Sequence, residues 1–213
     1  EDCLEILRRA RHSAGGPMLI EWHGERCDLA ADPEVLSCAD AFHRYAGIEL
    51  AAVAGNRDAL AEAVQSQAGL ACDPSDTWED IFFRVLLNRI EPWLGIGAPT
   101  FLTGYPREQA ALARMDPSEP GTAERVELYV CGLELANGFG ELTDAVEQRA
   151  RFTRDQSEKQ LLYNTSYPLP DSMLAALERG MPRTSGMALG FDRLVMLMTG
   201  AEHIEDVLWL PME

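Results

Sequence analysis

The chain has 213 residues, 46% of them hydrophobic, which suits a single globular domain with a sizeable core. Its formal net charge of −17 disfavours broad binding to nucleic-acid phosphates, and no apolar run approaches the roughly 18 residues that a membrane span needs. The N-terminus lacks the apolar stretch of a signal peptide, and the five scattered cysteines form no CxxC pair. We therefore expect a protein of the reducing cytoplasm, without a disulfide framework or a zinc site.

The N-terminal third reads as a short helix, a strand and a helical region. Residues 1–16 are expected to form a partial helix that ends at two glycines. The apolar run in residues 17–23 predicts a buried strand. Asp32 followed by Pro33 is typical of a helix start, because Asp caps free backbone N–H groups and Pro fits the first turn. Helices are therefore expected from Asp32 to about residue 67.

A second amphipathic helix is predicted over residues 75–94. Its large apolar residues recur at helical spacing, and Pro92 favours a stop near its end. Together the two helical regions predict a helical insertion at about residues 32–94.

From residue 99 onward the pattern changes to strands. PTFLTGYP and ERVELYVCGLEL both read as strands, and in the second Val126, Leu128 and Val130 alternate with other residues. This alternation is typical of a strand with two different faces.

The C-terminal part continues with helices around one further strand. A long polar helix is predicted over residues 143–162, with Thr143 as its N-cap. A loop and a short helix that ends at Gly180 follow. Residues 185–200 read as a glycine-rich strand that runs into an apolar helix.

Two acidic residues flank a turn signal in GLELANGFGELTD, residues 132–144. Glu134 and Glu141 lie on either side of Asn137-Gly138, a dipeptide typical of turns. If the chain bends there, both carboxylates return to one place, where they suit Mg²⁺ or an ammonium group. The alternative is a strand, a turn and a helix start with incidental acidic residues.

A second segment, GMALGFDRL at residues 186–194, joins a glycine-rich strand to a helix. Gly190 would let a flat ring lie against the backbone, and Arg193 would reach a phosphate or stack on a base. The alternative is tight strand–helix packing with a surface Asp-Arg pair. Neither GxGxxG nor GxxxxGK follows the strand, so Rossmann and P-loop sites lack support.

Together these segments resemble the class II lysyl-tRNA synthetase family. GLELANGFGELTD is similar to its active-site segment, and GMALGFDRLVMLMTGAEHIEDVLWLP to its motif 3 and the following strand. Within the family, ELANGF-ELTDA-EQ-RF and GMP--SG-ALG-DRLVML resemble the subgroup of short paralogues that lysylate elongation factor P. The resemblance extends from about Met18 to the C-terminus.

The resemblance implies an α+β fold, in which helices flank an antiparallel sheet that binds ATP and an amino acid. It implies one synthetase-like domain over residues 1–213, with core strands and motif 3 from about 99 to 213. The family's motif 1, which builds the dimer interface, is expected upstream of residue 1, so the core is expected to be N-terminally truncated. A homodimer is one state that the family allows.

The resemblance also implies roles for individual residues. Arg193 and Glu134 would be the catalytic residues, and Glu134 and Glu141 would hold Mg²⁺. The residues expected to contact ATP are Glu134, Leu135, Gly190 and Arg193. The residues expected at the amino acid are Glu141, Asn137 and His23, the last of which replaces the family's tyrosine. Motif 2 is degenerate, because EILRRARHSAGGP lacks its Arg-x-Glu and Asn-Pro-Glu-Phe signatures.

The implied activity is activation of lysine, or of a lysine isomer, as an aminoacyl-adenylate with ATP and Mg²⁺. The aminoacyl group would then pass to a lysine of elongation factor P. No anticodon-binding domain is visible, so tRNA is not the expected acceptor. The alternative is a catalytically impaired paralogue that binds nucleotide, amino acid or a partner protein.

Overall fold

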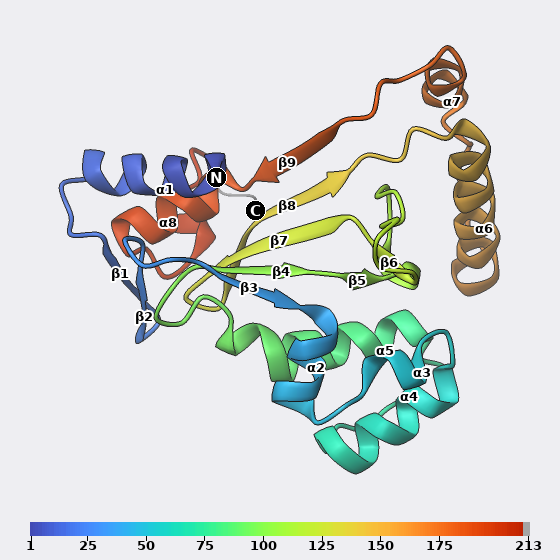
Figure 1. Cartoon of the computed structure of the whole chain (residues 1–213), viewed down its shortest axis with the longest axis horizontal. Coiled ribbons are helices and arrows are strands. Elements are labelled where there is room, and N and C mark those ends of the chain that lie inside the picture. Colours follow the sequence, from blue (N-terminus) through green and yellow to red (C-terminus); the bar gives the residue numbers. More distant parts are fainter. Residues whose placement is uncertain (211–213) are drawn as a thin grey trace.

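A five-stranded sheet organises the chain in the structure, a computed structural model that describes residues 1–210 (Figure 1). Its strand order is β3-β4-β7-β8-β9. The strands are β3 (Glu34–Ser37), β4 (Thr100–Thr103), β7 (Arg125–Val130), β8 (Leu133–Gly140) and β9 (Ser185–Leu189). All neighbours are antiparallel except β3 and β4, which run parallel. The expected α+β fold with a sheet flanked by helices is confirmed, although the sheet is mixed at one edge.

Two small antiparallel sheets accompany the main one. They pair β1 (Leu19–Trp22) with β2 (Glu25–Asp28), and β5 (Tyr105–Pro106) with β6 (Thr122–Ala123). The strand expected within residues 17–23 is therefore present, but Ile20 is its one buried residue. The expectation of a buried strand is wrong, because β1 belongs to a surface hairpin.

The region between β3 and β4 is helical. It contains α2 (Cys38–Ala46), α3 (Leu50–Val53), α4 (Arg57–Ala63) and α5 (Trp78–Val85), with π-helical turns at 64–68 and 86–90 and a 3₁₀ turn at 91–93. The predicted helix start at Asp32-Pro33 is wrong. Val35 and Leu36 pair with β4 instead, and the Ser37 side chain caps α2 by accepting from Asp40 N–H. The division of the chain into one domain with an insertion at about 32–94 stays a prediction.

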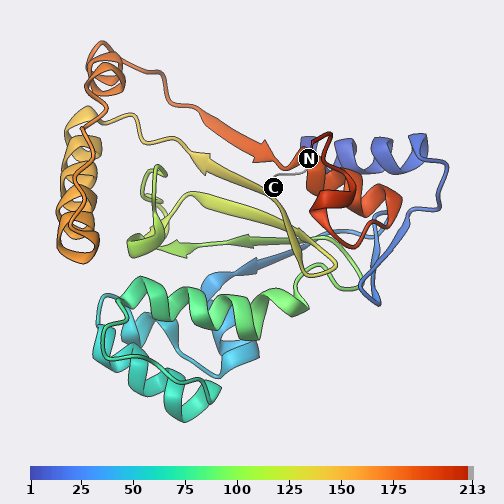
Figure 2. The ribbon, with the colours of Figure 1, turned by 180° about the vertical axis from the view of Figure 1, so that it is seen from behind.

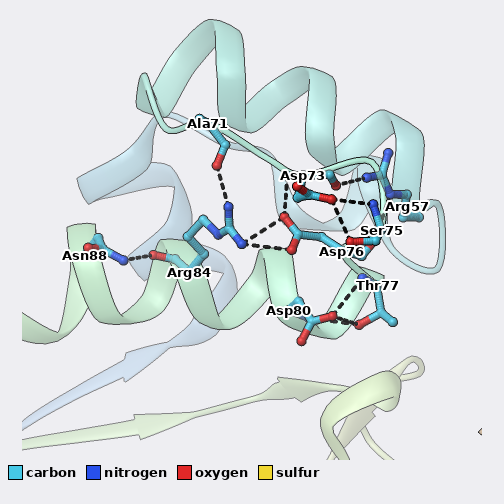
Figure 3. Close-up of polar contacts among 9 residues, drawn as sticks. All are labelled: Arg57, Ala71, Asp73, Ser75, Asp76, Thr77, Asp80, Arg84 and Asn88. Atoms are coloured by element: carbon cyan, nitrogen blue, oxygen red, sulfur yellow. Dashed lines mark hydrogen bonds and ion pairs between the residues drawn. The ribbon is translucent and has the colours of Figure 1, made fainter. Parts of the chain in front are cut away.

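Two partly buried arginines hold the loop before α5 (Figure 3). Arg84 pairs with the Asp76 carboxylate at 2.8 Å and donates to the Ala71 carbonyl, while Arg57 donates to the Asp73 carbonyl. Thr77 then caps α5 in a reciprocal capping box with its N3 residue. The predicted helix over 75–94 is confirmed, with its first residue at Trp78.

The helices α6 (Ala145–Tyr163) and α7 (Asp171–Glu178) lie beyond the far ends of β8 and β9, away from α1 and α8 (Figures 1 and 2). The Asp144 carboxylate caps α6 by accepting from Val146 and Glu147 N–H. The prediction of Thr143 as the N-cap is therefore wrong by one residue.

The two faces of the sheet carry different cores. Leu102 and Tyr129 pack with α2 to α5 on one face. Leu128 and Val130 pack with α1 (Asp2–Ser13) and α8 (Phe191–Thr199) on the other. We call the first face the acidic face, because Glu127 on β7 alternates with Leu128 and shares the side of Tyr129. None of the helices in residues 1–210 has the length and apolar character that crossing a membrane requires.

Candidate active site on the acidic face

The turn between β7 and β8 lies at Cys131-Gly132, not at Asn137-Gly138. Cys131 and Gly132 have φ angles of 52° and 73°, as a two-residue type I′ hairpin turn requires. Asn137 and Gly138 lie inside β8, where both pair with residues of β7. A Cβ atom at Gly138 would lie 2.8 Å from the Gly186 carbonyl oxygen, so this glycine permits close strand packing rather than a bend.

The predicted meeting of Glu134 and Glu141 is wrong, because β8 runs without a reversal from Leu133 to Gly140. At a rise of about 3.3 Å per residue, seven residues of strand separate the two positions by roughly 20 Å. The two carboxylates therefore do not hold one metal ion between them in this structure. Each has its own surroundings along the same strand.

A β-bulge near the start of β8 sets which side chains share a face. Glu134 pairs with Tyr129 and Asn137 pairs with Glu127, so one extra residue of β8 lies in between. Residues that pair directly across a ladder project from the same face of the sheet. The bulge therefore places both Glu134 and Asn137 on the acidic face, which simple alternation along β8 would not do.

Arg193 and Glu134 form the centre of the predicted ATP site. The Arg193 guanidinium donates to the Glu134 carbonyl oxygen at 2.6 Å and lies 3.3 Å from the Glu134 carboxylate. Both side chains are partly exposed, 43% for Arg193 and 31% for Glu134, so a ligand can reach them.

Gly190 and Leu135 lie beside this pair. The Gly190 N–H donates to the Leu135 carbonyl oxygen at 2.9 Å, which joins the first turn of α8 to β8. The Leu135 side chain is buried in the core beneath α8, so its backbone is the part that can face a ligand. The structure thus brings together all four residues expected at ATP.

Glu127 was not among the predicted site residues, yet it lies at the centre of the acidic face. Its carboxylate accepts hydrogen bonds from the hydroxyls of Tyr105 and Tyr129, from Arg125 at 2.7 Å and from Asn137 at 3.0 Å. The pKa values of both tyrosines are raised by burial, with the nearby carboxylate adding to the effect for each. Glu127 therefore fixes the Asn137 amide. Its position between Val126 and Leu128 in a strand is the one sequence signal for a buried functional acid.

A third carboxylate, Glu91, lies near the turn of the β7–β8 hairpin. The pKa of Glu91 is raised to about 7, first by burial and then by the charges of Glu134 and Glu127, while the charge of Arg193 acts in the opposite direction. The residue precedes Pro92 at the end of the helical region, and its sequence pattern carries no functional signal.

Glu141 follows β8 at the other end of the acidic face. Its backbone N–H donates to the Thr184 carbonyl oxygen at 3.1 Å, and its partly buried side chain lies over Gly186 of β9. Arg114 also donates to Thr184, at 2.9 Å, and pairs with Glu124. Glu141 is thus a partly buried carboxylate on a fixed backbone, and such a group can bind a cation.

His23 does not join the predicted amino-acid site. It lies exposed in the turn of the β1–β2 hairpin, where its ring contacts Trp22 and its Nε2 is 3.3 Å from the Glu202 carbonyl oxygen. This hairpin packs with Leu128 on the face opposite Asn137. The structure therefore does not bring His23 together with Asn137, because the sheet lies between them, and the assignment of His23 to the amino-acid pocket stays a prediction.

The residues of the acidic face fit Mg²⁺ only with help from a phosphate ligand. Within residues 1–210, no group of three or more His, Cys, Asp or Glu side chains is arranged to hold a metal ion. Mg²⁺ usually takes one or two carboxylates together with substrate phosphates. The accessible Glu134 carboxylate meets that requirement, whereas Glu127 already accepts four hydrogen bonds.

The fold agrees with the protein family that the chain matches. A model of the family "tRNA synthetases class II (D, K and N)" matches residues 90–213. The chain belongs to this family, and the resemblance found in its motifs is confirmed.

Its relatives include two kinds of lysine ligase. An elongation factor P–(R)-β-lysine ligase of Proteus mirabilis is 40% identical over 179 residues, 84% of this chain and 54% of the relative. A lysine–tRNA ligase of Pelotomaculum thermopropionicum is 33% identical over 208 residues, 98% of this chain and 41% of the relative. The chain spans about half the length of these curated relatives.

Proposed function

We propose that this chain activates lysine or a lysine isomer with ATP and transfers it to a lysine of elongation factor P. One observation carries the proposal. The partly exposed Arg193 in the first turn of α8 pairs with Glu134 of β8, the strand that also presents Asn137 on the acidic face and leads into Glu141. The names of the relatives support a lysine-type substrate.

In the proposed first step, the substrate carboxylate attacks the α-phosphorus of ATP in line, and pyrophosphate leaves. Arg193 neutralises charge on the phosphates, and its planar guanidinium can also stack on the base. Glu134 would hold Mg²⁺, which would neutralise further phosphate charge when it is bound. The protein contributes mainly position and fixed charge, because little covalent help is needed.

The amino-acid end of the proposed site uses the rest of β8. Glu141 would pair with a cationic amino group of the substrate, and Asn137, whose amide Glu127 holds, would line the pocket. In the second step, a lysine amine of elongation factor P attacks the acyl carbon of the adenylate, and AMP leaves. The amine loses a proton as the amide bond forms.

ATP–pyrophosphate exchange, measured with α-lysine and with (R)-β-lysine in Mg²⁺, tests this proposal. We expect Glu134→Ala and Arg193→Ala to weaken ATP binding strongly, about tenfold or more. We expect Glu141→Ala to raise KM for the amino acid more than the Kd for ATP. Glu62→Ala, an exposed acid on α4, is the matched control and should change neither.

The proposal would be refuted if the folded wild-type chain showed no ATP–pyrophosphate exchange with either lysine isomer. ATP binding without exchange would instead favour the catalytically impaired alternative. Exchange without transfer to elongation factor P would support the proposed activation of lysine but refute elongation factor P as the acceptor.

A further inference from the structure

Neither the backbone conformation nor the backbone packing requires glycine at Gly186 on β9. Its φ angle lies outside the left-handed region, so the backbone accepts an L side chain, and the residue is exposed. A Cβ atom here would lie 3.1 Å from Glu141 Oε1. Within the described residues 1–210, and leaving aside its neighbours in the chain, no other atom would lie within 4 Å. The Glu141 carboxylate is therefore the one neighbour for which the missing side chain matters.

The other glycines of the strand pair differ from Gly186. At Gly140 a Cβ would clash with the Glu124 carboxylate and lie 2.9 Å from the Arg114 guanidinium, two groups that already hold each other in an ion pair. At Gly138 a Cβ would meet a backbone carbonyl at 2.8 Å, so that glycine is required for strand packing. At Gly190 a Cβ would make ordinary contacts of 3.5 Å or more. At Gly186 the contact is with the tip of a flexible side chain. That tip can move by a few tenths of an ångström at little cost to folding, but then the carboxylate no longer lies in the same place.

We propose that Gly186 is a positioning residue for amino-acid recognition: its lack of a side chain lets the Glu141 carboxylate lie across β9, where it meets the cationic group of the substrate. The inference rests on the proposed function and deepens it. The Glu141 backbone is fixed by Thr184 and by a bridge to Ala113, so the side chain alone would have to respond to an added methyl group.

The experiment compares Gly186→Ala with wild type in lysine-dependent ATP–pyrophosphate exchange. We expect KM for the lysine-type substrate to rise about fivefold, because small misplacements of a binding group are costly. We expect kcat, the Kd for ATP and the free energy of unfolding to stay unchanged. Ser185→Ala, at the exposed neighbouring position on β9, is the matched control and should leave KM unchanged.

A double-mutant cycle with Glu141→Asp separates positioning from any general effect of the methyl group. The shorter Asp side chain withdraws from position 186, so Gly186→Ala should have almost no further effect on KM in that background. In the Glu141→Gln background, where the side-chain shape is kept, the added methyl group should still raise KM.

Three results would overturn the inference. The first is an equal KM for wild type and Gly186→Ala. The second is that Gly186→Ala raises KM by the same factor whether residue 141 is Glu or is changed by Glu141→Asp. Wild-type protein without exchange for either lysine isomer would reject the proposed function and this inference with it, whereas the first two results reject the inference alone.

Discussion

Glu91 shows how burial and neighbouring charge act on one residue of the site. Its pKa of about 7 in the folded protein lies above the ordinary value of 4.5, so the folded state binds the proton more tightly than the unfolded state. Its contribution to stability is therefore present below about pH 4.5 and is lost as the pH rises through about 7.

Glu91→Gln should remove this contribution to the pH dependence of stability. Compared with wild type, we expect the variant to gain free energy of unfolding at pH 8 and to gain less at pH 5. Urea denaturation at both pH values measures the difference, and Glu62→Gln on exposed α4 is the control. A gain for Glu91→Gln that is the same at both pH values would contradict the assignment of the raised pKa to Glu91.

The sequence predicts the residues of the candidate site that stand out locally, but not those whose role depends on distant partners. Glu134 and Arg193 belong to short segments with recognisable glycines, and the structure brings them within 3.3 Å. Glu127 looks like an ordinary alternating residue of a strand. Its importance depends on Tyr105, which lies 22 residues away and donates its hydroxyl to the same carboxylate.

The start of α6 gives a test at the scale of one element. The Asp144 carboxylate accepts from two backbone N–H groups, at 2.8 and 3.0 Å, whereas Thr143 is the residue that local sequence rules favour. Asp144→Ala should lower the free energy of unfolding by about 1 kcal/mol through loss of the cap. Thr143→Ala, the matched control, should have little effect in the same chemical denaturation experiment. The reverse order would show that the cap lies at Thr143.

Two glycines in the loop before β4 allow a second comparison of matched substitutions. Gly95 and Gly97 both have positive φ angles, of 73° and 81°, so alanine is strained by about 1–2 kcal/mol at either position. A Cβ at Gly95 would also lie 2.6 Å from the backbone of Tyr129, while none of the described atoms outside the neighbouring residues would be within 4 Å of a Cβ at Gly97. We therefore expect Gly95→Ala to be the more destabilising by about 1–3 kcal/mol, as measured by urea denaturation. Equal losses would mean that Gly95 does not pack against β7 as described.

Long-range pairing explains the elements that local patterns miss. Residues 34–37 look like the start of a helix, but Val35 pairs with Phe101 of β4, more than sixty residues away. Asn137-Gly138 is typical of a turn, but the closeness of β9 keeps Gly138 extended. By contrast, the helix within 75–94 and the strand–helix unit at 185–200 carry their signals within one segment, and the structure confirms both.

At the scale of the whole molecule, the net charge of −17 bears on the choice of acceptor. The summed field repels the phosphates of tRNA, so we expect no saturable binding of a lysine-accepting tRNA at physiological salt up to about 10 µM. Fluorescence anisotropy with labelled tRNA measures this, and a single-stranded RNA of equal length controls for non-specific contacts. Saturable binding of the tRNA but not of the control RNA would reject elongation factor P as the exclusive acceptor.

The segment that connects β8 to β9 leaves and rejoins the sheet at neighbouring positions. Gly140 pairs with Ser185, and Glu141 N–H donates to the Thr184 carbonyl, so the chain leaves the sheet and returns to it across one hydrogen-bonded step. Everything between these residues, including α6 and α7, therefore begins and ends at the same two points. A change in the length of this segment would therefore leave the pairing of β8 with β9 and the backbone position of Glu141 intact, provided that Arg151 of α6 still reaches the Ala111 and Ala113 carbonyls.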